Sequence, residues 1–204
     1  MDHYGIKNLN LMYLFATNNR KITNINYITN LKVLYAEKKY CINQSGIMNL
    51  DLVELYVSDN SKITNVNHMK QLKILHAENK SGIADLGIKD LDLLELRVSD
   101  NSKITNINHM KNLKILYANN IYRNCGIGDF GIKDLDFLEL RVSNNSKITN
   151  VNYMKNLKIL YAENNCGISD LGIKDLDLLE LYISHNPKIT DVDHMKNLKI
   201  FCQY

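Results

Sequence analysis

The sequence predicts an α/β solenoid with about ten short parallel β-strands on its concave face and 3₁₀ or irregular turns on its convex face. The first observation is a short pattern, clearest in LLELRVSDN at Leu93–Asn101, which recurs along the whole chain. The second is its spacing, because its middle apolar residue returns every 20 or 21 residues, with one step of 24. Repetition at a fixed short period is typical of solenoids. The markers are Leu14, Leu34, Leu55, Leu75, Leu96, Leu116, Leu140, Leu160, Leu181 and Phe201.

The repeated pattern resembles the leucine-rich repeat family. It reads L-x-x-L-x-L-x-x-N, with clear copies at Leu52–Asn60, Phe137–Asn145 and Leu178–Asn186. The resemblance implies a right-handed leucine-rich-repeat solenoid, most similar to the short-repeat subclass of phosphatase-regulator-like and internalin-like proteins. Those relatives are protein-binding modules without catalytic activity. We expect one domain over residues 1–204, without separate caps.

Each strand should present one row of side chains to the core and another to solvent. Leu96 and Val98 are two residues apart, so they point to one face of their strand, whereas Glu95, Arg97 and Ser99 point to the other. A single unit cannot bury its apolar row. Neighbouring units therefore stack into a parallel sheet with a continuous leucine core.

The connection that follows each strand is predicted to consist of turns. Its apolar residues, for example Ile104, Ile107, Met110 and Leu113, recur every three residues. This spacing suits loose turns or 3₁₀ segments better than a long α-helix.

An asparagine closes each odd-numbered copy, where the chain must turn sharply out of its strand. Its amide can pair with backbone groups that the bend leaves unsatisfied, and the resemblance implies a ladder of such asparagines. In even-numbered copies Lys39 and Lys80 replace it, Asn165 keeps it, and Asn124 keeps it if an insertion precedes it. We expect those turns to be looser. The odd-numbered positions are Asn19, Asn60, Asn101, Asn145 and Asn186.

The four cysteines, Cys41, Cys125, Cys166 and Cys202, are interpreted as cytosolic thiols. Cys125 and Cys166 hold matching places two units apart, so their Cα atoms should be about 10 Å apart, beyond disulfide reach. No run of residues is apolar and long enough for a transmembrane helix or a signal peptide. We therefore expect a cytoplasmic, intracellular protein.

Charge is nearly balanced, with a net charge of +3. Lysines such as Lys70 and Lys155 lie in odd-numbered units, and aspartates such as Asp90 and Asp175 lie in even-numbered ones. Alternating stripes attract each other weakly and create no field of a single sign that would bind nucleic acid. Neither nucleic acid nor membrane is expected as a partner.

No metal site is predicted. His68, His109 and His194 occupy places that Tyr27 and Tyr153 hold in other units. Residues on alternate coils that tyrosine can replace do not converge as zinc ligands. We interpret them as half-exposed residues of the convex side.

No enzyme activity and no cofactor are predicted either. Ser184 and His185 are adjacent, so they point to opposite faces of a strand and cannot pair as nucleophile and base. Glycines such as Gly82 and Gly87 are repeat turn positions, and no Gly-Lys-Ser/Thr of a phosphate loop follows them.

The strand face that does not enter the core leads to the functional prediction, a non-catalytic protein–protein interaction module. The residue after each marker forms what we call the strand-face column, in which tyrosine and arginine predominate. These two residue types most often carry protein interfaces. The alternative is that the column only stacks on itself, with cation–π contacts between neighbours. Phe15 and Cys202 are the two end residues of the column, and the predicted partner-binding residues lie between them: Tyr35, Tyr56, His76, Arg97, Tyr117, Arg141, Tyr161 and Tyr182.

One insertion interrupts the spacing. Ile121, Tyr122 and Arg123 follow Asn120 in the sixth unit and are expected to bulge at the rim, where loop variation commonly carries recognition. Tyr122 is therefore a further candidate partner-binding residue. The alternative is a tolerated loop insertion without a role.

A second hypothesis is a self-assembling structural repeat protein. Met1–Leu14 resembles the tail of an even-numbered unit, and Phe201–Tyr204 resembles the start of another strand. Both ends would then present an unpaired strand edge through which copies could associate.

Overall fold

The structure is a computed structural model that describes residues 5–7, 9–39 and 42–202. The chain divides into two compact units, Met1–Arg97 and Val98–Tyr204. The prediction of a single domain over residues 1–204 stays a prediction. Cys41 lies outside the described residues.

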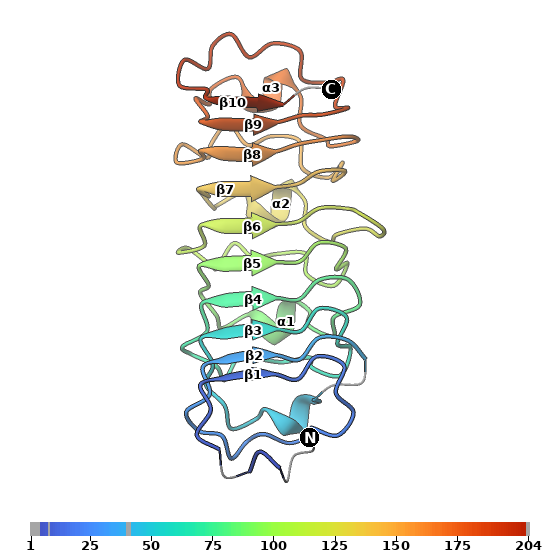
Figure 1. Ribbon diagram of the computed structural model, residues 1–204. Helices are drawn as coiled ribbons and strands as arrows, with labels where there is room; N and C mark the ends of the chain where they lie inside the picture. The colour runs from blue at the N-terminus through green and yellow to red at the C-terminus, as the bar shows by residue number, and fades with distance from the viewer. Residues whose placement is uncertain (1–4, 8, 40–41, 203–204) are drawn as a thin grey trace. The chain divides into compact units, whose positions relative to one another are not determined.

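The first unit contains a parallel sheet whose strands follow one another in chain order (Figure 1). Each strand pairs residue for residue with the next, so that Leu14 stands opposite Leu34 and Leu55 opposite Leu75. Every strand is three residues long and is centred on a predicted marker. The strands are β1 (Tyr13–Phe15), β2 (Val33–Tyr35), β3 (Glu54–Tyr56), β4 (Ile74–His76) and β5 (Glu95–Arg97).

The second unit repeats this arrangement with five further parallel strands. Leu116 stands opposite Leu140, and Leu160 opposite Leu181. Together the two units confirm the predicted fold class, a solenoid of the leucine-rich-repeat type with ten parallel strands. The strands are β6 (Ile115–Tyr117), β7 (Glu139–Arg141), β8 (Ile159–Tyr161), β9 (Glu180–Tyr182) and β10 (Ile200–Cys202).

The core of each unit is built from the marker leucines and the apolar residue two places later. Leu96 is fully buried in the first unit, and Leu140 and Val142 are fully buried in the second. Phe201 differs, because it is 42 % exposed in the last described strand. Burying a leucine side chain contributes about 1.5–3 kcal/mol relative to leaving it exposed.

The odd-numbered coils return through successive turns, as their three-residue spacing predicts. Met110 donates its backbone N–H to Ile107 at 3.0 Å, and Leu113 donates to Met110 at 3.1 Å. These bonds span three residues, and all three side chains are buried. The apolar residue of each turn thus reaches the core without a helix.

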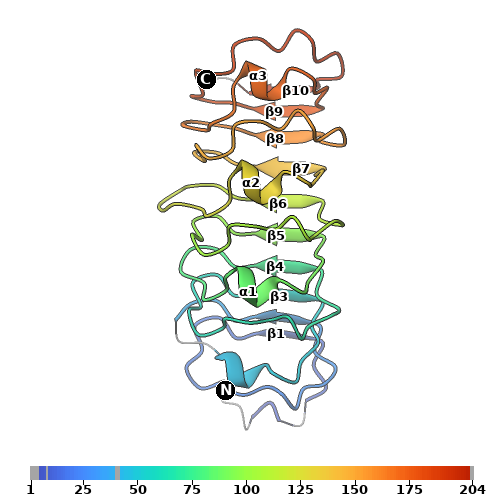
Figure 2. The same ribbon diagram turned by 180° about the vertical axis from the view of Figure 1, so that it is seen from behind.

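The even-numbered coils contain short helices; over the described residues one is a 3₁₀ helix, as predicted, and three are α-helices where only 3₁₀ or irregular turns are predicted. They lie on the side of the sheet away from the viewer in Figure 1 and face the viewer in Figure 2. The third residue of each is glycine, and a Cβ at Gly131 would overlap the carbonyl oxygen of Thr105 in the preceding coil. The helices are η1 (Gln44–Gly46), α1 (Asp85–Ile88), α2 (Asp129–Ile132) and α3 (Asp170–Ile173).

The asparagine ladder of the odd-numbered coils is confirmed. Asn60 is buried, and its Nδ2 donates to the carbonyls of Ala36 at 2.8 Å and Ile42 at 3.0 Å. Its Oδ1 accepts the backbone N–H of Lys62 at 3.0 Å. One amide thus ties its own turn to the preceding coil. The equivalent acceptor bonds are made by Asn19, Asn101, Asn145 and Asn186.

The prediction that Asn165 and Asn124 keep this role in even-numbered coils is wrong. Both side chains are exposed, and the next residue in each coil, Cys166 or Cys125, is buried instead. The Cys125 thiol donates to the carbonyl of Val98 at 3.4 Å, and burial raises the pKa of both thiols to about 11. A small thiol therefore fills the space that the amide fills in odd-numbered coils. These thiols are free rather than joined in a disulfide, as predicted.

Candidate interaction surface

The strand-face column occupies the last residue of every strand, on the face opposite the leucine core. In both units this follows from strand geometry, because the residue after a buried leucine must point the other way. All the column residues from Tyr35 to Cys202 are partly exposed, and Phe15 is 71 % exposed. The column is therefore accessible to a partner, although its members also contact one another.

In the first unit the column is a stack of rings. The ring centroids of Phe15 and Tyr35 are 4.4 Å apart, and those of Tyr35 and Tyr56 are 4.0 Å apart with nearly parallel planes. His76 meets Tyr56 edge to face at 4.4 Å. Offset and edge-to-face pairs of this kind contribute about 0.5–1.5 kcal/mol each.

In the second unit an arginine is enclosed by tyrosines. The Arg141 guanidinium lies 4.6 Å from the ring centroid of Tyr117 and 4.0 Å from that of Tyr161. Tyr161 in turn stacks on Tyr182 at 4.0 Å. Stacking of the column on itself is thus observed within both units, and the stacked residues remain partly exposed.

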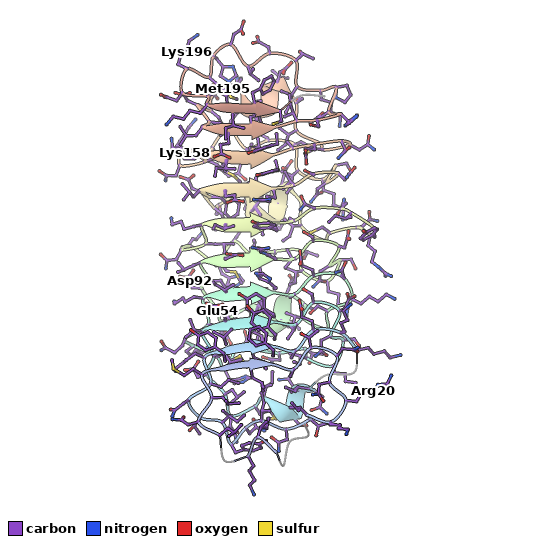
Figure 3. The ribbon with its side chains drawn as sticks, viewed as in Figure 1. Arg20, Glu54, Asp92, Lys158, Met195 and Lys196 are labelled. Atoms are coloured by element: carbon purple, nitrogen blue, oxygen red, sulfur yellow. The ribbon has the colours of Figure 1, made fainter. Side chains whose placement is uncertain are left out.

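Glutamates two residues before the column hold its members in place. The Tyr56 hydroxyl donates to Glu54 at 2.8 Å, and the Tyr182 hydroxyl donates in the same way to Glu180. Figure 3 labels Glu54 on β3. Burial and the bond to Glu54 raise the pKa of Tyr56, so its hydroxyl remains a donor.

The arginines of the column are held by the same kind of contact. Arg97 Nε donates to Glu95 at 2.7 Å, and Arg141 Nε donates to Glu139 at 2.6 Å. Burial opposes the charge of Arg141, but the bond to Glu139 and the electrostatic effects of Glu139, Tyr117 and Tyr161 together outweigh it, so the pKa of Arg141 is raised. The contact with glutamate thus orients both arginines.

His76 remains neutral near pH 7. Burial and the positive charge of Arg97 lower the pKa of His76 to about 4, although its hydrogen bond to Glu95 at 3.2 Å acts in the opposite direction. Its ring therefore contributes to the column as a neutral aromatic group.

The insertion is held by an aspartate of the preceding coil. Asp100 is buried, and its carboxylate accepts the backbone N–H groups of Ile121, Tyr122 and Arg123 at 2.8, 3.0 and 2.9 Å. The Ile121 and Tyr122 side chains are 59 % and 86 % exposed. The insertion thus lies at the surface, as expected, and its backbone is anchored.

A similar contact between an aspartate and the backbone of the next coil occurs in the first unit. Asp59 holds the place of Asp100 in the first unit, has a positive φ of 62° like the 60° of Asp100, and accepts a single N–H, from Lys80. Asparagine and aspartate tolerate this left-handed conformation better than most residues. The carboxylate of Asp100 thus accepts three N–H groups from the insertion, where that of Asp59 accepts one.

A pocket of about 320 Å³ lies beside the insertion in the second unit. It opens beyond the ends of β7 and β8, between the inserted Ile121 and the column residues Arg141 and Tyr161. Sequence reasoning named these residues individually but did not place them together. Further lining residues are Asn119, Ser143, Asn144, Glu163 and Asn164.

The histidines of the opposite side have a structural role. His68 Nε2 lies 3.2 Å from the carbonyl oxygen of Ile47, and the Tyr153 hydroxyl donates to that of Ile132 at 3.1 Å. Histidine and tyrosine are interchangeable here because each places a polar hydrogen on the same carbonyl of the preceding coil. Over the described part of the chain, no three histidine, cysteine or acidic side chains are grouped to hold a metal ion.

Aspartates of the even-numbered coils bind the backbone of the next coil. Asp170 accepts the backbone N–H of Thr190 at 2.7 Å and its hydroxyl at 2.8 Å, and that backbone bond lowers the pKa of Asp170. Figure 3 places Asp92 and Lys158 where the chain enters its strands. The charged stripes thus contribute hydrogen bonds to the turns.

Three apolar side chains are exposed on the short helices, and sequence reasoning did not identify them. Each is the second residue of its helix, next to the glycine that contacts the preceding coil. Because the glycine faces inward, its neighbour faces solvent. The residues are Leu86, Phe130 and Leu171, at 77, 71 and 75 % exposure.

Comparison with known proteins supports the fold. No protein-family model matches the sequence, and no curated protein matches it. The structure is similar to the crystal structure of an internalin, InlF, from Listeria monocytogenes str. 4b F2365, with a TM-score of 0.59. The two share 20 % sequence identity over 98 % of this chain and 76 % of the internalin chain. The similarity agrees with the predicted leucine-rich-repeat solenoid; the subclass stays a prediction. Over the described residues, no helix has the length and apolar character to cross a membrane.

Proposed function

We propose that this protein is a non-catalytic protein–protein interaction module that binds its partner through the strand-face column. The observation that carries the proposal is the column itself, which presents one partly exposed residue per strand, mostly tyrosine or arginine. Interfaces are enriched in these residues because they combine a large contact area with polar groups. The similarity to an internalin fits an interaction scaffold.

The stacking of the column supports binding instead of opposing it. Association requires side chains to lose rotamer freedom, at about 0.5–1.5 kcal/mol for each side chain that becomes ordered. Arg141 is already held by two rings and by Glu139. The free-energy cost of ordering the Arg141 side chain is therefore largely incurred on folding, and a partner that contacts Arg141 adds little to it.

A protein partner fits this surface better than nucleic acid does. The arginines of the column are bonded to glutamates of the same strands, Arg97 to Glu95 and Arg141 to Glu139. Each of these two arginines thus stands beside a carboxylate, so the column lacks the run of unpaired cations on which binding to a phosphate backbone depends.

Site-specific photo-crosslinking tests which face binds. The photoreactive residue p-benzoylphenylalanine would replace Tyr182 in the column or, as the matched control, Tyr153 on the opposite side. Both are tyrosines of the second unit, and the hydroxyl of each donates a hydrogen bond within the chain. Proteins crosslinked in an extract of the source cells would be identified by mass spectrometry.

We expect one protein to crosslink from the Tyr182 position and not from the Tyr153 position. The purified partner should then lose at least about tenfold in affinity for Arg141→Ala, the range for a central interface arginine. Crosslinking from Tyr153 alone would contradict the proposal. A second copy of this chain as the main product would favour the self-assembling alternative.

A further inference from the structure

The pocket beside the insertion combines an anchored loop with a fixed arginine. The repeat has one insertion, Ile121 to Arg123, and it precedes the strand that carries Arg141. Ile121 and Arg141 both line the pocket. Its volume of about 320 Å³ is at the lower end of the range for ligand sites, so it has room for one side chain and the adjoining backbone.

Two residues of this pocket, Arg141 and Asn119, offer hydrogen-bond donors to a ligand. Arg141 uses Nε for Glu139, and among the described residues its Nη atoms have no hydrogen-bond partner. Asn119 uses its Oδ1 to accept the Ser143 N–H at 2.8 Å, which leaves its Nδ2 as the group it offers. Arg141 lines the pocket, whereas Glu139, which holds its Nε, does not.

The anionic acceptor of the pocket is Glu163. Its Oε2 accepts the Ser143 hydroxyl at 3.1 Å, and its other oxygen has no hydrogen-bond partner within the described structure. A ligand that fits must therefore bring an anionic acceptor for Arg141 and also an N–H donor for Glu163. A small free carboxylate supplies only the first.

From this pattern we propose that the pocket binds an acidic side chain, Asp or Glu, within an extended segment of the partner protein. The acidic carboxylate pairs with the Nη atoms of Arg141, which suit a two-bond contact. A backbone N–H of the same segment donates to Glu163. The proposal rests on the proposed function and names the chemistry that the interaction surface recognises.

The exposed part of the insertion extends this contact. Tyr122 is 86 % exposed while its backbone N–H is bonded to Asp100. An aromatic side chain on a fixed backbone adds contact area at small entropic cost. Tyr122 therefore contacts the partner residue next to the acidic one.

Peptide binding by the full chain tests the proposal. The probes are three pools of fluorescein-labelled hexapeptides, acetylated and amidated at their ends, with random residues around a fixed central Glu, Gln or Lys. Binding is measured by fluorescence anisotropy. We expect the Glu pool to bind at least about tenfold more tightly than the Gln pool, as a charge-assisted pair requires, and the Lys pool to bind more weakly still.

Two variants locate the binding. Arg141→Gln should remove the preference for Glu, and Arg97→Gln should keep it, because Arg97 follows a glutamate in the same way but belongs to the first unit and does not line this pocket. Deletion of residues 121–123 should weaken Glu-pool binding at least about fivefold if Tyr122 and Ile121 contribute as interface side chains do. Circular dichroism and urea midpoints check that each variant is folded.

Several outcomes would overturn the proposal. These are equal binding of the Glu and Gln pools, equal loss in the Arg141 and Arg97 variants, or no effect of the deletion in a folded protein. A free C-terminal carboxylate that competes better than an internal Glu would also overturn it. If such an outcome accompanies crosslinking from Tyr182, only the pocket chemistry fails; crosslinking from Tyr153 alone removes the interaction surface itself.

Discussion

The Nδ2 atom of Asn145 lies 2.9 Å from the carbonyl oxygen of Ala118, which precedes it by 27 residues. The same atom reaches the carbonyl of Ile127 at 3.1 Å, while its Oδ1 accepts the N–H of Lys147. Asn145 is fully buried. Without its side chain, three backbone groups inside the fold would lose their hydrogen bonds.

Replacing Asn145 with alanine is therefore expected to lower the free energy of unfolding by about 2–4 kcal/mol, since buried groups without partners cost about 1–3 kcal/mol each and partly recover through water. The control is Asn165→Ala, which follows its strand at the same distance in sequence but has an exposed side chain. Urea denaturation measures both. Equal midpoints for the two variants would show that the ladder does not stabilise the fold.

The marker leucines are expected to be the largest apolar contributors. Leu140→Ala should lower the free energy of unfolding by about 2–5 kcal/mol, the range for a buried leucine. Lys111→Ala should change it little, because the Lys111 side chain is exposed and its ammonium group donates to the carbonyl of Asp134 at 3.3 Å on the surface. Denaturant titrations of the two variants give the comparison, and similar values would contradict the repeat register.

Two glycines of one helical turn should respond differently to alanine. At Gly131 a Cβ would overlap the carbonyl oxygen of Thr105, so Gly131→Ala should cost about 1–3 kcal/mol or more, as overpacking does. At Gly128 the nearest atoms are Lys147 Cβ and carbonyl oxygen, at 3.0 and 3.1 Å.

Gly128→Ala is the matched control, because the corresponding residues before the α-helices α1 and α3 are Ala84 and Ser169. It should leave thermal stability unchanged or raise it slightly, since alanine restricts the unfolded chain by about 0.4–1 kcal/mol. A larger loss at Gly128 than at Gly131 would be incompatible with the observed contact between coils.

Stability should depend on the protonation of His76. Its pKa is lowered from 6.5 to about 4 in the folded chain, so the unfolded chain binds the proton more readily between these values. The contribution to stability is present above pH 6.5 and is lost as the pH falls toward 4. The full loss would be about 3 kcal/mol, since one pKa unit corresponds to about 1.4 kcal/mol.

His76→Tyr is the control for this prediction, because Tyr117 and Tyr161 hold the same place in other even-numbered coils. Urea midpoints at pH 7 and pH 4.5 should fall further in the wild-type protein than in the variant. An NMR titration of the His76 ring should give a midpoint near 4. A midpoint near 6.5 would mean that the ring is not buried as described.

The sequence alone determined the features that depend on local geometry. The strands are centred on the predicted markers because an apolar residue every 20 or 21 positions can be buried only if the coils stack in register. The strand-face column followed for the same reason: the neighbours of a buried strand residue point to the opposite face. The pairing of the Asn60 amide with backbone groups could also be predicted, since its turn recurs in every odd-numbered coil.

Only the tertiary structure decided which distant atoms meet. Cys125 takes the ladder position because the carbonyl of Val98 lies within reach of its thiol, and no pattern within one coil indicates that. Asp100 holds an insertion that begins 21 residues later, and Arg141 meets that insertion across a pocket. Periodicity specifies the direction of each side chain, whereas its partner comes from a coil about 20 residues away. The offset between neighbouring coils therefore decides these contacts, and it exists only once the coils have stacked.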